Sequence, residues 1–268
     1  MNIINLENDN RKFINSLGCF KVLEYERDLS VNTFTAQNEF FMSKMGVRRR
    51  QVVIGLKGNS AVIQAGAMQW TSGAIQVTTG VKGVGDLMGK MFKGAVTKES
   101  AVKPEYKGTG VVALEPTYKY ILLEDVSKWG KGMVIEDGMF LACDGTVNQN
   151  VIARKNVSSA VLGGEGMFNL SLSGAGVVAL ESIVPAEELI EVQLNGDELK
   201  IDGNMAVAWS AELDFTVEKA GSSLIGSAVS GEGLVNVYRG TGKVLMSPVA
   251  PTSGILNAAA SVAARPVK

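Results

Sequence analysis

The sequence contains no histidine among its 268 residues. Histidine is the most frequent general base in enzymes and a leading ligand of transition metals. Its absence therefore excludes Ser-His and Cys-His catalysis and histidine metal centres. We expect a protein that is not an enzyme and carries no cofactor. A metal-dependent hydrolase that relies on carboxylates alone is the remaining enzymatic alternative.

Cysteine and long apolar runs are also scarce. The two cysteines, Cys19 and Cys143, are far apart and outside any CxxC pattern, so neither a disulfide framework nor a thiolate metal site is indicated. No apolar run reaches the roughly 18 residues that span a bilayer, and the polar first dozen residues do not suit a signal peptide. We therefore expect a soluble, cytoplasmic protein, with peripheral contact as its only association with a membrane.

The chain lacks an excess of charge of either sign, because 26 Lys and Arg stand against 27 Asp and Glu. A sequence-specific nucleic acid partner is therefore not expected. The charges are unevenly placed. Residues 1–107 hold fifteen basic and nine acidic residues, a surplus of +6, and residues 108–268 hold eleven and eighteen, which gives −7. The two halves are expected to attract each other or to attract neighbouring subunits.

What the chain does contain is an internal repeat. The stretches "GTGVVALE" from Gly108, "GAGVVALE" from Gly174 and the weaker "GTGKVLMS" from Gly240 begin at equal intervals along the chain. Two more landmarks recur in the same order. One is a glycine five residues before an isoleucine, at Gly58/Ile63, Gly130/Ile135 and Gly196/Ile201. The other is a glutamate beside small residues, eight or nine residues before each G-x-G, at Glu99, Glu165 and Glu232.

These landmarks divide the chain into three units, 50–116, 117–183 and 184–250, with an N-terminal extension of residues 1–49 that packs on the first unit and a C-terminal tail of residues 251–268. Each unit consists of short apolar stretches punctuated by glycine, which predicts an all-β fold. The G-x-G glycines are interpreted as structural, because strand entries and bulges adopt conformations that a Cβ penalises.

Three local predictions follow from the pattern. In "LIEVQLNGDELKIDG" two alternating runs are joined by Asn195-Gly196, which predicts a β-hairpin. Residues 80–95 interrupt the first unit, and their apolar spacing predicts a short helix. The Ala-rich tail is expected to be a small helix or disordered.

Two groups of charged residues are candidate sites. A basic patch on the first unit would bind an anionic ligand or an anionic membrane surface, and consists of Arg48, Arg49, Arg50, Lys82, Lys90 and Lys93. A solvated face or a contact between subunits is the favoured use of this patch. The repeated Glu99, Glu165 and Glu232 are weak candidates for a Ca²⁺ or Mg²⁺ site, and local hydrogen bonds at turns are the favoured interpretation.

The stretches "GEGMFNLSLSGAGVVALES" and "VIQAGAMQW" (residues 62–70), together with the three-unit layout, resemble the altered-inheritance-of-mitochondria family, member twenty-four. The resemblance covers residues 50–250. It implies a β-sandwich unit like that of the trp RNA-binding attenuation protein (TRAP), present three times, and a family whose eukaryotic members are linked to mitochondrial inner-membrane organisation. It implies no catalytic residue. An RNA-binding ring would repeat a basic residue before each G-x-G, but Lys107, Ser173 and Arg239 do not keep one.

Repeated β units leave strand edges at both ends of the chain, and such edges favour pairing with another chain. The uneven charge offers a head-to-tail contact between subunits, and contacts of this kind close into rings. We therefore expect a non-enzymatic structural or interaction protein that forms a homo-oligomer, with a homotrimer as the expected size. A peripheral membrane or anionic-ligand binder that acts through the basic patch is the alternative.

Overall fold

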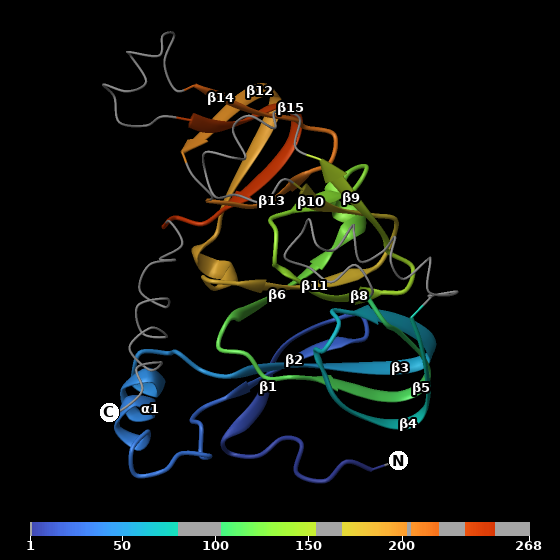
Figure 1. Cartoon of the computed structure of the whole chain (residues 1–268), viewed down its shortest axis with the longest axis vertical. Coiled ribbons are helices and arrows are strands. Elements are labelled where there is room, and N and C mark those ends of the chain that lie inside the picture. The colour runs from blue at the N-terminus through green and yellow to red at the C-terminus, as the bar shows by residue number, and fades with distance from the viewer. Residues whose placement is uncertain (1, 80–102, 154–167, 203–204, 220–233, 250–268) are drawn as a thin grey trace, which may run out of the picture.

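The computed structural model describes residues 2–79, 103–153, 168–202, 205–219 and 234–249. In these residues fifteen β-strands accompany one α-helix and two 3-10 helices, arranged along one long axis (Figure 1). The expected all-β class is confirmed. The helix predicted over residues 80–95 and the tail at 251–268 lie outside the described residues.

The first sheet has eight strands, and all of its pairings are antiparallel. Its order is β1-β2-β3-β8-β11-β6, and β5 pairs with both β3 and β4. The strands are β1 (Arg11–Leu17), β2 (Phe20–Tyr25), β3 (Arg50–Ile63), β4 (Met68–Thr78), β5 (Glu105–Leu114), β6 (Tyr120–Asp125), β8 (Phe140–Asp144) and β11 (Val177–Ser182).

The second sheet has seven antiparallel strands in the order β12-β15-β13-β7-β10-β9, and β14 also pairs with β15. These strands are β7 (Met133–Ile135), β9 (Asn148–Ala153), β10 (Phe168–Ser173), β12 (Ile190–Asp202), β13 (Ala206–Ser210), β14 (Asp214–Lys219) and β15 (Leu234–Met246). The helices are α1 (Ala36–Lys44), η1 (Val126–Trp129) and η2 (Ala186–Glu188).

The apolar core consists of three successive clusters. Ile54 and Leu114 belong to the first, Trp129 to the second and Trp209 to the third, and each of these side chains is almost completely buried. The clusters do not follow single stretches of sequence, because Val134 of β7 belongs to the third cluster. Burial of large apolar side chains is the main favourable contribution to folding. The shared clusters therefore join neighbouring groups of strands as well as stabilising each group.

Strand positions recur along the chain. Strands β8, β9 and β10 begin at Phe140, Asn148 and Phe168, and β13, β14 and β15 follow them at one constant interval, from Ala206, Asp214 and Leu234. The pairing recurs as well. Strand β11 lies between β6 and β8, the C-terminal part of β15 lies between β12 and β13, and β5 lies between β3 and β4. The same antiparallel arrangement is therefore present at three places in the fold.

The β-hairpin predicted at Asn195-Gly196 is wrong. Strand β12 continues through both residues and pairs with β15 along its whole length, with a register shift between Asn195 and Asp197. Gly196 has a φ of +74° at this shift. A glycine with positive φ suits a β-bulge as well as a tight turn. A bulge forms here rather than a turn, because the long neighbouring strand β15 offers backbone partners on both sides of Gly196.

The N-terminal extension contains more structure than its sequence indicated. The strand-like "FKVLEY" is β2, which forms a hairpin with β1 and pairs with β3. Helix α1 was not predicted. It buries none of its side chains, so it lacks the apolar face from which helices are predicted.

Two strands approach closely where β5 contains Gly108 and Gly110. A Cβ at Gly110 would clash with the backbone oxygen of Ser72 in β4. A glycine in a strand often marks such a close approach of two backbones. Gly55 in β3 is a natural comparison, because a Cβ there would meet nothing within 4 Å.

Replacement of Gly110 by alanine is therefore expected to destabilise the protein. Neither Gly110 nor Gly55 has a backbone in the left-handed region, so the two substitutions differ only in the room available for a Cβ atom. Gly110→Ala forces the β4 and β5 backbones apart and is expected to lower the free energy of unfolding by about 2 kcal/mol. Gly55→Ala should change it by less than about 0.5 kcal/mol. Urea unfolding measures both, and equal stabilities would contradict the close approach.

Candidate functional site

Six of the nine candidate site residues lie outside the described residues: Lys82, Lys90, Lys93, Glu99, Glu165 and Glu232. The convergence of the three glutamates and the lysine half of the basic patch therefore stay predictions. Arg48, Arg49 and Arg50 are described, and they lie just before and at the first residue of β3.

Arg48 and Arg50 share a carboxylate partner. Arg48 forms ion pairs with Glu24 at 3.1 Å and with Glu26 at 3.0 Å, and Arg50 pairs with the other oxygen of Glu24 at 2.8 Å. The sheet positions this group, because Glu24 of β2 and Arg50 of β3 are cross-strand neighbours. Arg50 is only 5% exposed, and its guanidinium lies 4.0 Å from the ring centre of Tyr120. Arg50 is therefore a structural residue rather than part of an open cationic surface.

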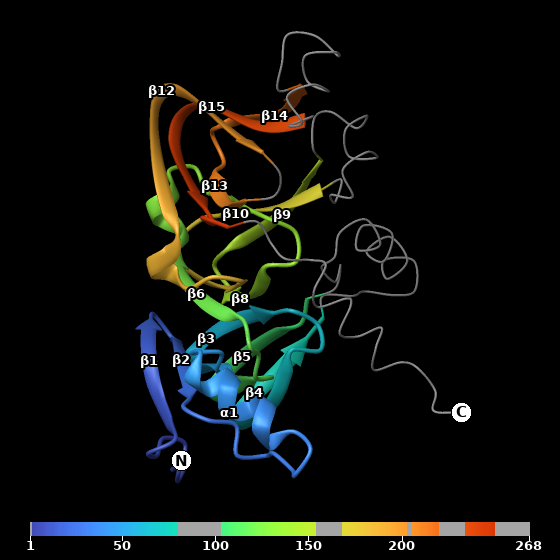
Figure 2. The same cartoon turned by 90° about the vertical axis from the view of Figure 1, so that its left-hand side faces the viewer.

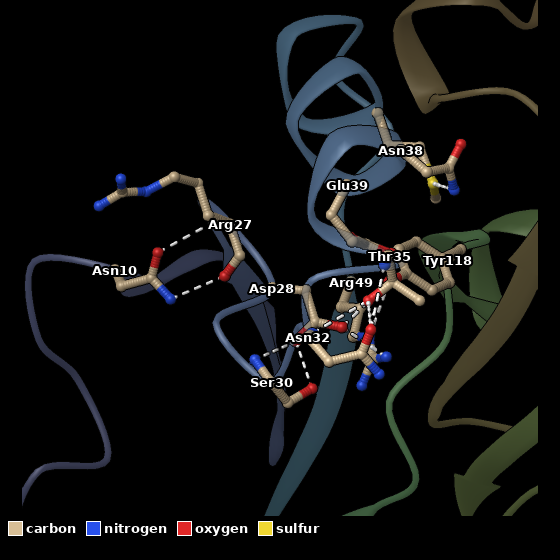
Figure 3. A network of polar contacts seen from close by, with 11 residues as sticks. Asn10, Arg27, Asp28, Ser30, Asn32, Thr35, Asn38, Glu39, Arg49 and Tyr118 are labelled. Atoms are coloured by element: carbon tan, nitrogen blue, oxygen red, sulfur yellow. Dashed lines mark hydrogen bonds and ion pairs between the residues drawn. The ribbon is translucent and has the colours of Figure 1, made fainter.

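Arg49 is the centre of a second group, which we call the Arg49 network: Asp28, Glu39, Arg49 and Tyr118 (Figure 3). Its guanidinium forms an ion pair with Asp28 at 2.5 Å and donates a hydrogen bond from Nε to the Tyr118 hydroxyl at 3.0 Å. That hydroxyl donates in turn to Glu39 of α1 at 2.9 Å. The network therefore ties α1 and the loop before it to the start of β3 and to Tyr118, just before β6.

The environment fixes the protonation states in the Arg49 network. Burial raises the pKa of Asp28, but hydrogen bonds from Ser30 and the charge of Arg49 outweigh burial, and the net effect is a lowered pKa. Burial raises the pKa of the Tyr118 hydroxyl, and Glu39 raises it further, against the opposing effect of Arg49. At neutral pH Asp28 is therefore ionised and Tyr118 is neutral. Such a hydroxyl can accept from Arg49 and donate to Glu39 at the same time.

Carboxylates thus balance the arginine half of the predicted patch. Arg48, Arg49 and Arg50 face Glu24, Glu26 and Asp28 in ion pairs. A cluster that attracts anions from a distance needs uncompensated positive charge. These three arginines organise the N-terminal extension, and binding of an anion through the patch would depend on the three lysines.

Sequence reasoning missed the surface of α1 and the residues before it. Phe40, Phe41 and Met45 are 57%, 57% and 79% exposed, and Phe34 is 93% exposed. Polar contacts hold the helix instead, such as the hydrogen bond from the Ser43 hydroxyl to the Glu26 carbonyl oxygen at 2.8 Å. The adjacent aromatic residues in "NEFFMSK" were the available signal. Phe40 and Phe41 lie edge to face with their ring centres 5.5 Å apart, so they form a small exposed aromatic pair.

The two cysteines are free thiols without activation. Burial, and next the negative charge of Asp144, raise the pKa of Cys19 to about 12. Burial is also the main cause that raises the pKa of Cys143 to about 12. A nucleophilic cysteine needs a lowered pKa, so neither thiol is suited to covalent catalysis. Within the described ranges, His, Cys, Asp and Glu side chains form no group of three that could hold a metal ion.

In the part of the chain that the structure describes, no helix has both the length and the apolar character needed to cross a membrane. The fold defines an all-β protein with three buried apolar clusters, and the described arginine ion pairs join its N-terminal region to the start of β3. The chain belongs to the family described as Mitochondrial biogenesis AIM24, whose family model matches residues 42–249. This confirms the family resemblance found in the repeated motifs.

Two relatives from Streptococcus pyogenes support the assignment. An uncharacterized protein of serotype M6 is 30% identical over 195 residues, which cover 70% of this chain and 76% of the relative. A crystal structure of a protein from the same species is similar with a TM-score of 0.56 and 26% sequence identity, over 81% of this chain and 93% of that chain. The shared fold therefore extends over most of both proteins.

The Arg49 network predicts that the Tyr118 hydroxyl contributes to stability. Tyr118→Phe removes one donor and one acceptor from charged partners and is expected to lower the free energy of unfolding by about 1 kcal/mol. The matched control is Tyr120→Phe, since no hydrogen bond of the Tyr120 hydroxyl is found among the described residues and its ring would still lie against Arg50. Thermal and urea unfolding measure both variants, and an equal loss in the two would show that the network does not stabilise the fold.

Proposed function

We propose that the protein is a non-enzymatic structural or interaction protein that works as a homo-oligomer built from three TRAP-like units per chain, 50–116, 117–183 and 184–250. The observation that carries this proposal is the recurring strand arrangement. Each unit would contribute a central strand between two neighbours, as β5, β11 and β15 do. Such repeats are stabilised mainly by contacts with their neighbours, so the outer faces of the first and last units favour a partner.

Local irregularities support the three units. Against their central strands, β4 has a register shift between Met68 and Trp70, and β13 has one between Ala206 and Ala208. Strand β8 skips a residue at the corresponding place, between Phe140 and Ala142. Bulges are designed features of a fold rather than random defects. Their recurrence at one position therefore favours duplication of a single unit.

The chemistry of the described side chains supports an interaction role over catalysis. Both thiols have raised pKa values, and Glu124, whose pKa is raised mainly by burial, accepts a hydrogen bond from the indole of Trp129 at 3.2 Å. An enzyme places its perturbed groups together in a cleft with a reacting atom within reach. Cys143 instead belongs to a buried apolar cluster, and Glu124 is a half-buried residue that bonds to the indole of Trp129.

We propose a homotrimer as the size of the assembly, in the cytoplasm. A contact between unlike surfaces of successive subunits closes into a ring when the rotation per subunit allows it, and three units are few to close a ring alone. Static light scattering at micromolar concentration is expected to give about 85 kDa, three times the 28.3 kDa of one chain. A mass near 28.3 kDa would contradict the proposal, and a stable dimer would keep the interaction role but remove the trimer.

A second candidate function is peripheral binding to an anionic membrane surface or to a protein. The exposed Phe40 and Phe41 of α1, with Lys44 beside them, favour this candidate. Aromatic side chains next to a basic residue are typical of segments that lie in the membrane interface. The lysine half of the basic patch would add electrostatic attraction.

The second candidate predicts two separable effects on sedimentation with vesicles that contain phosphatidylserine. Replacement of Phe40 and Phe41 by serine should remove most of the bound fraction at every salt concentration, because it removes the inserted apolar groups. Replacement of Lys82, Lys90 and Lys93 by alanine should remove only the salt-sensitive part. If the unaltered protein stays in the supernatant at low salt, the second candidate is excluded.

A further inference from the structure

Successive units are joined by the same pair of strands. The first linking pair is β3 with β8, where Ile63 lies opposite Ala142. The second linking pair is β7 with β13, where Ile135 lies opposite Ala208. Both pairs are antiparallel and comprise three residues on each side. The same contact between successive units therefore occurs twice in one chain.

Hydrogen bonds that flank the linking pairs show that their registers are equal. In the first pair, Gln64 N–H donates to Leu141 O at 2.8 Å, and Gly145 N–H donates to Ser60 O at 2.8 Å. In the second pair the bonds are at the corresponding positions, from Glu136 N–H to Val207 O at 3.1 Å and from Ala211 N–H to Gly132 O at 2.9 Å. The two linking pairs therefore share one register and one bonding pattern.

The second unit contributes one strand of each kind, β7 and β8, to the linking pairs. Among the described strands, one strand of the first unit and one strand of the third unit therefore have no counterpart in a linking pair. The step from Ile63 to Ile135 gives the interval between the first and second units, and the step from Ala142 to Ala208 gives the interval between the second and third. Ile201 in β12 follows Ile135 by the second interval, so it is the equivalent of Ile135 in the third unit. Trp70 in β4 precedes Ala142 by the first interval, so it is the equivalent of Ala142 in the first unit.

The register shift beside Trp70 supports its assignment as the equivalent of Ala142. Strand β4 shifts between Met68 and Trp70, in the same place as the shifts of β8 and β13 against their own central strands. Strand β4 is therefore the counterpart of β8 and β13, and β12 is the counterpart of β3 and β7.

Both strands have an open edge. Among the described strands, β4 is hydrogen-bonded to β5 alone and β12 to β15 alone. Exposure differs as this predicts. Thr71 of β4 is exposed, whereas the equivalent Cys143 and Trp209 are 0% and 2% exposed. Lys200 of β12 is exposed, whereas the equivalent Val134 is 2% exposed. A covering strand is thus missing at both edges in the described chain.

The two open edges cannot cover each other within one chain. Strands β4 and β12 lie at opposite ends of the long axis in both views (Figures 1 and 2). An unpaired edge of a sheet is a ready template for a strand of another chain. A second copy of this chain supplies the complementary strand at either end, with the spacing and the direction that the linking pairs already use.

We infer that β12 of one subunit pairs antiparallel with β4 of the next, with Ile201 opposite Trp70, Lys200 opposite Thr71 and Leu199 opposite Ser72. This inference rests on the proposed homo-oligomer and specifies its interface. The half-exposed Trp70 provides an aromatic side chain at one end of the paired stretch, and aromatic residues are enriched in protein interfaces.

The charges of β12 are compatible with this contact. Lysine on an edge strand normally discourages pairing, but the Lys200 ammonium forms an ion pair with Glu198 at 3.0 Å, and Glu198 also pairs with Arg239 at 2.6 Å. The facing stretch of β4, from Gln69 to Gly73, carries no charge. Pairing therefore brings no like charges together along this stretch.

The bonding pattern singles out Thr71 for a test. Hydrogen-bonded pairs alternate along an antiparallel ladder, so Val62 with Cys143, midway between the two flanking bonds, is such a pair. Its equivalent is Lys200 with Thr71, and the N–H of Thr71 faces the neighbouring subunit. Proline is tolerated on an edge strand where its missing N–H would face outward. Thr71→Pro is expected to leave the folded monomer and reduce the mass to 28.3 kDa, whereas Thr71→Val, which keeps the N–H, stays assembled.

Disulfide trapping tests the register directly. Leu199 and Ser72 form a pair that is not hydrogen-bonded, in which Cα atoms lie about 4.5 Å apart, within the range that a disulfide spans. Ser72→Cys combined with Leu199→Cys is expected to give covalent dimers and larger species on a non-reducing denaturing gel after mild oxidation. The matched control is Val77→Cys with Leu199→Cys, because Val77 lies on the same strand beyond the paired stretch and is 52% exposed. The chain with only its native Cys19 and Cys143 is the second control.

The outcomes separate this inference from the proposed function. Cross-linking at least fivefold stronger for the Ser72 pair than for the Val77 pair supports the register. An assembled protein that gives equal or no cross-linking with the two pairs overturns the inference and leaves the oligomer standing. An assembled Thr71→Pro variant overturns it as well. A monomeric unaltered protein overturns the proposed homo-oligomer, and the inference with it.

Discussion

The backbone pairing that links one group of strands to the next is the constraint on which the rest of the structure depends. It determines which strands are covered on both sides. Strand β8 lies between β3 and β11, and strand β13 lies between β7 and β15. Buried apolar clusters then extend across the links, as Val134 in the third cluster shows. Glycines at close approaches, such as Gly110, let neighbouring strands within a group, here β4 and β5, come near enough to pair.

The N-terminal extension covers one edge of β3, whereas β6 and β12 are edge strands among the described residues. Strand β2 pairs with the first half of β3, and the ion pairs of Arg48 and Arg50 with Glu24 secure the pairing. Much of the positive charge near the start of β3 is therefore compensated within the extension itself. Attraction between the basic and acidic halves of the sequence is correspondingly weaker, and the backbone edge becomes the principal basis for the proposed contact between subunits.

Short apolar stretches punctuated by glycine made the all-β class predictable, and two of the three G-x-G stretches lie within strands, β5 and β15. The Asn195-Gly196 hairpin was wrong, because a local turn signal cannot report that β15 runs alongside on both sides of Gly196. Helix α1 was missed since tertiary polar contacts, not an apolar face, hold it. Arg49 was identified as a candidate, but its partners were not, because Tyr118 lies 69 residues away in the sequence.

Backbone amide exchange at the two open edges tests the central claim most directly. The account predicts that the amides of Thr71 in β4 and Lys200 in β12 exchange slowly in the assembled protein and rapidly after dilution to the monomer. The amide of Cys143, which lies in an internal linking pair, should stay protected under both conditions. Rapid exchange at Thr71 and Lys200 in a protein shown to be assembled would contradict the claim that the ends of the chain meet by the same strand pairing that joins its units.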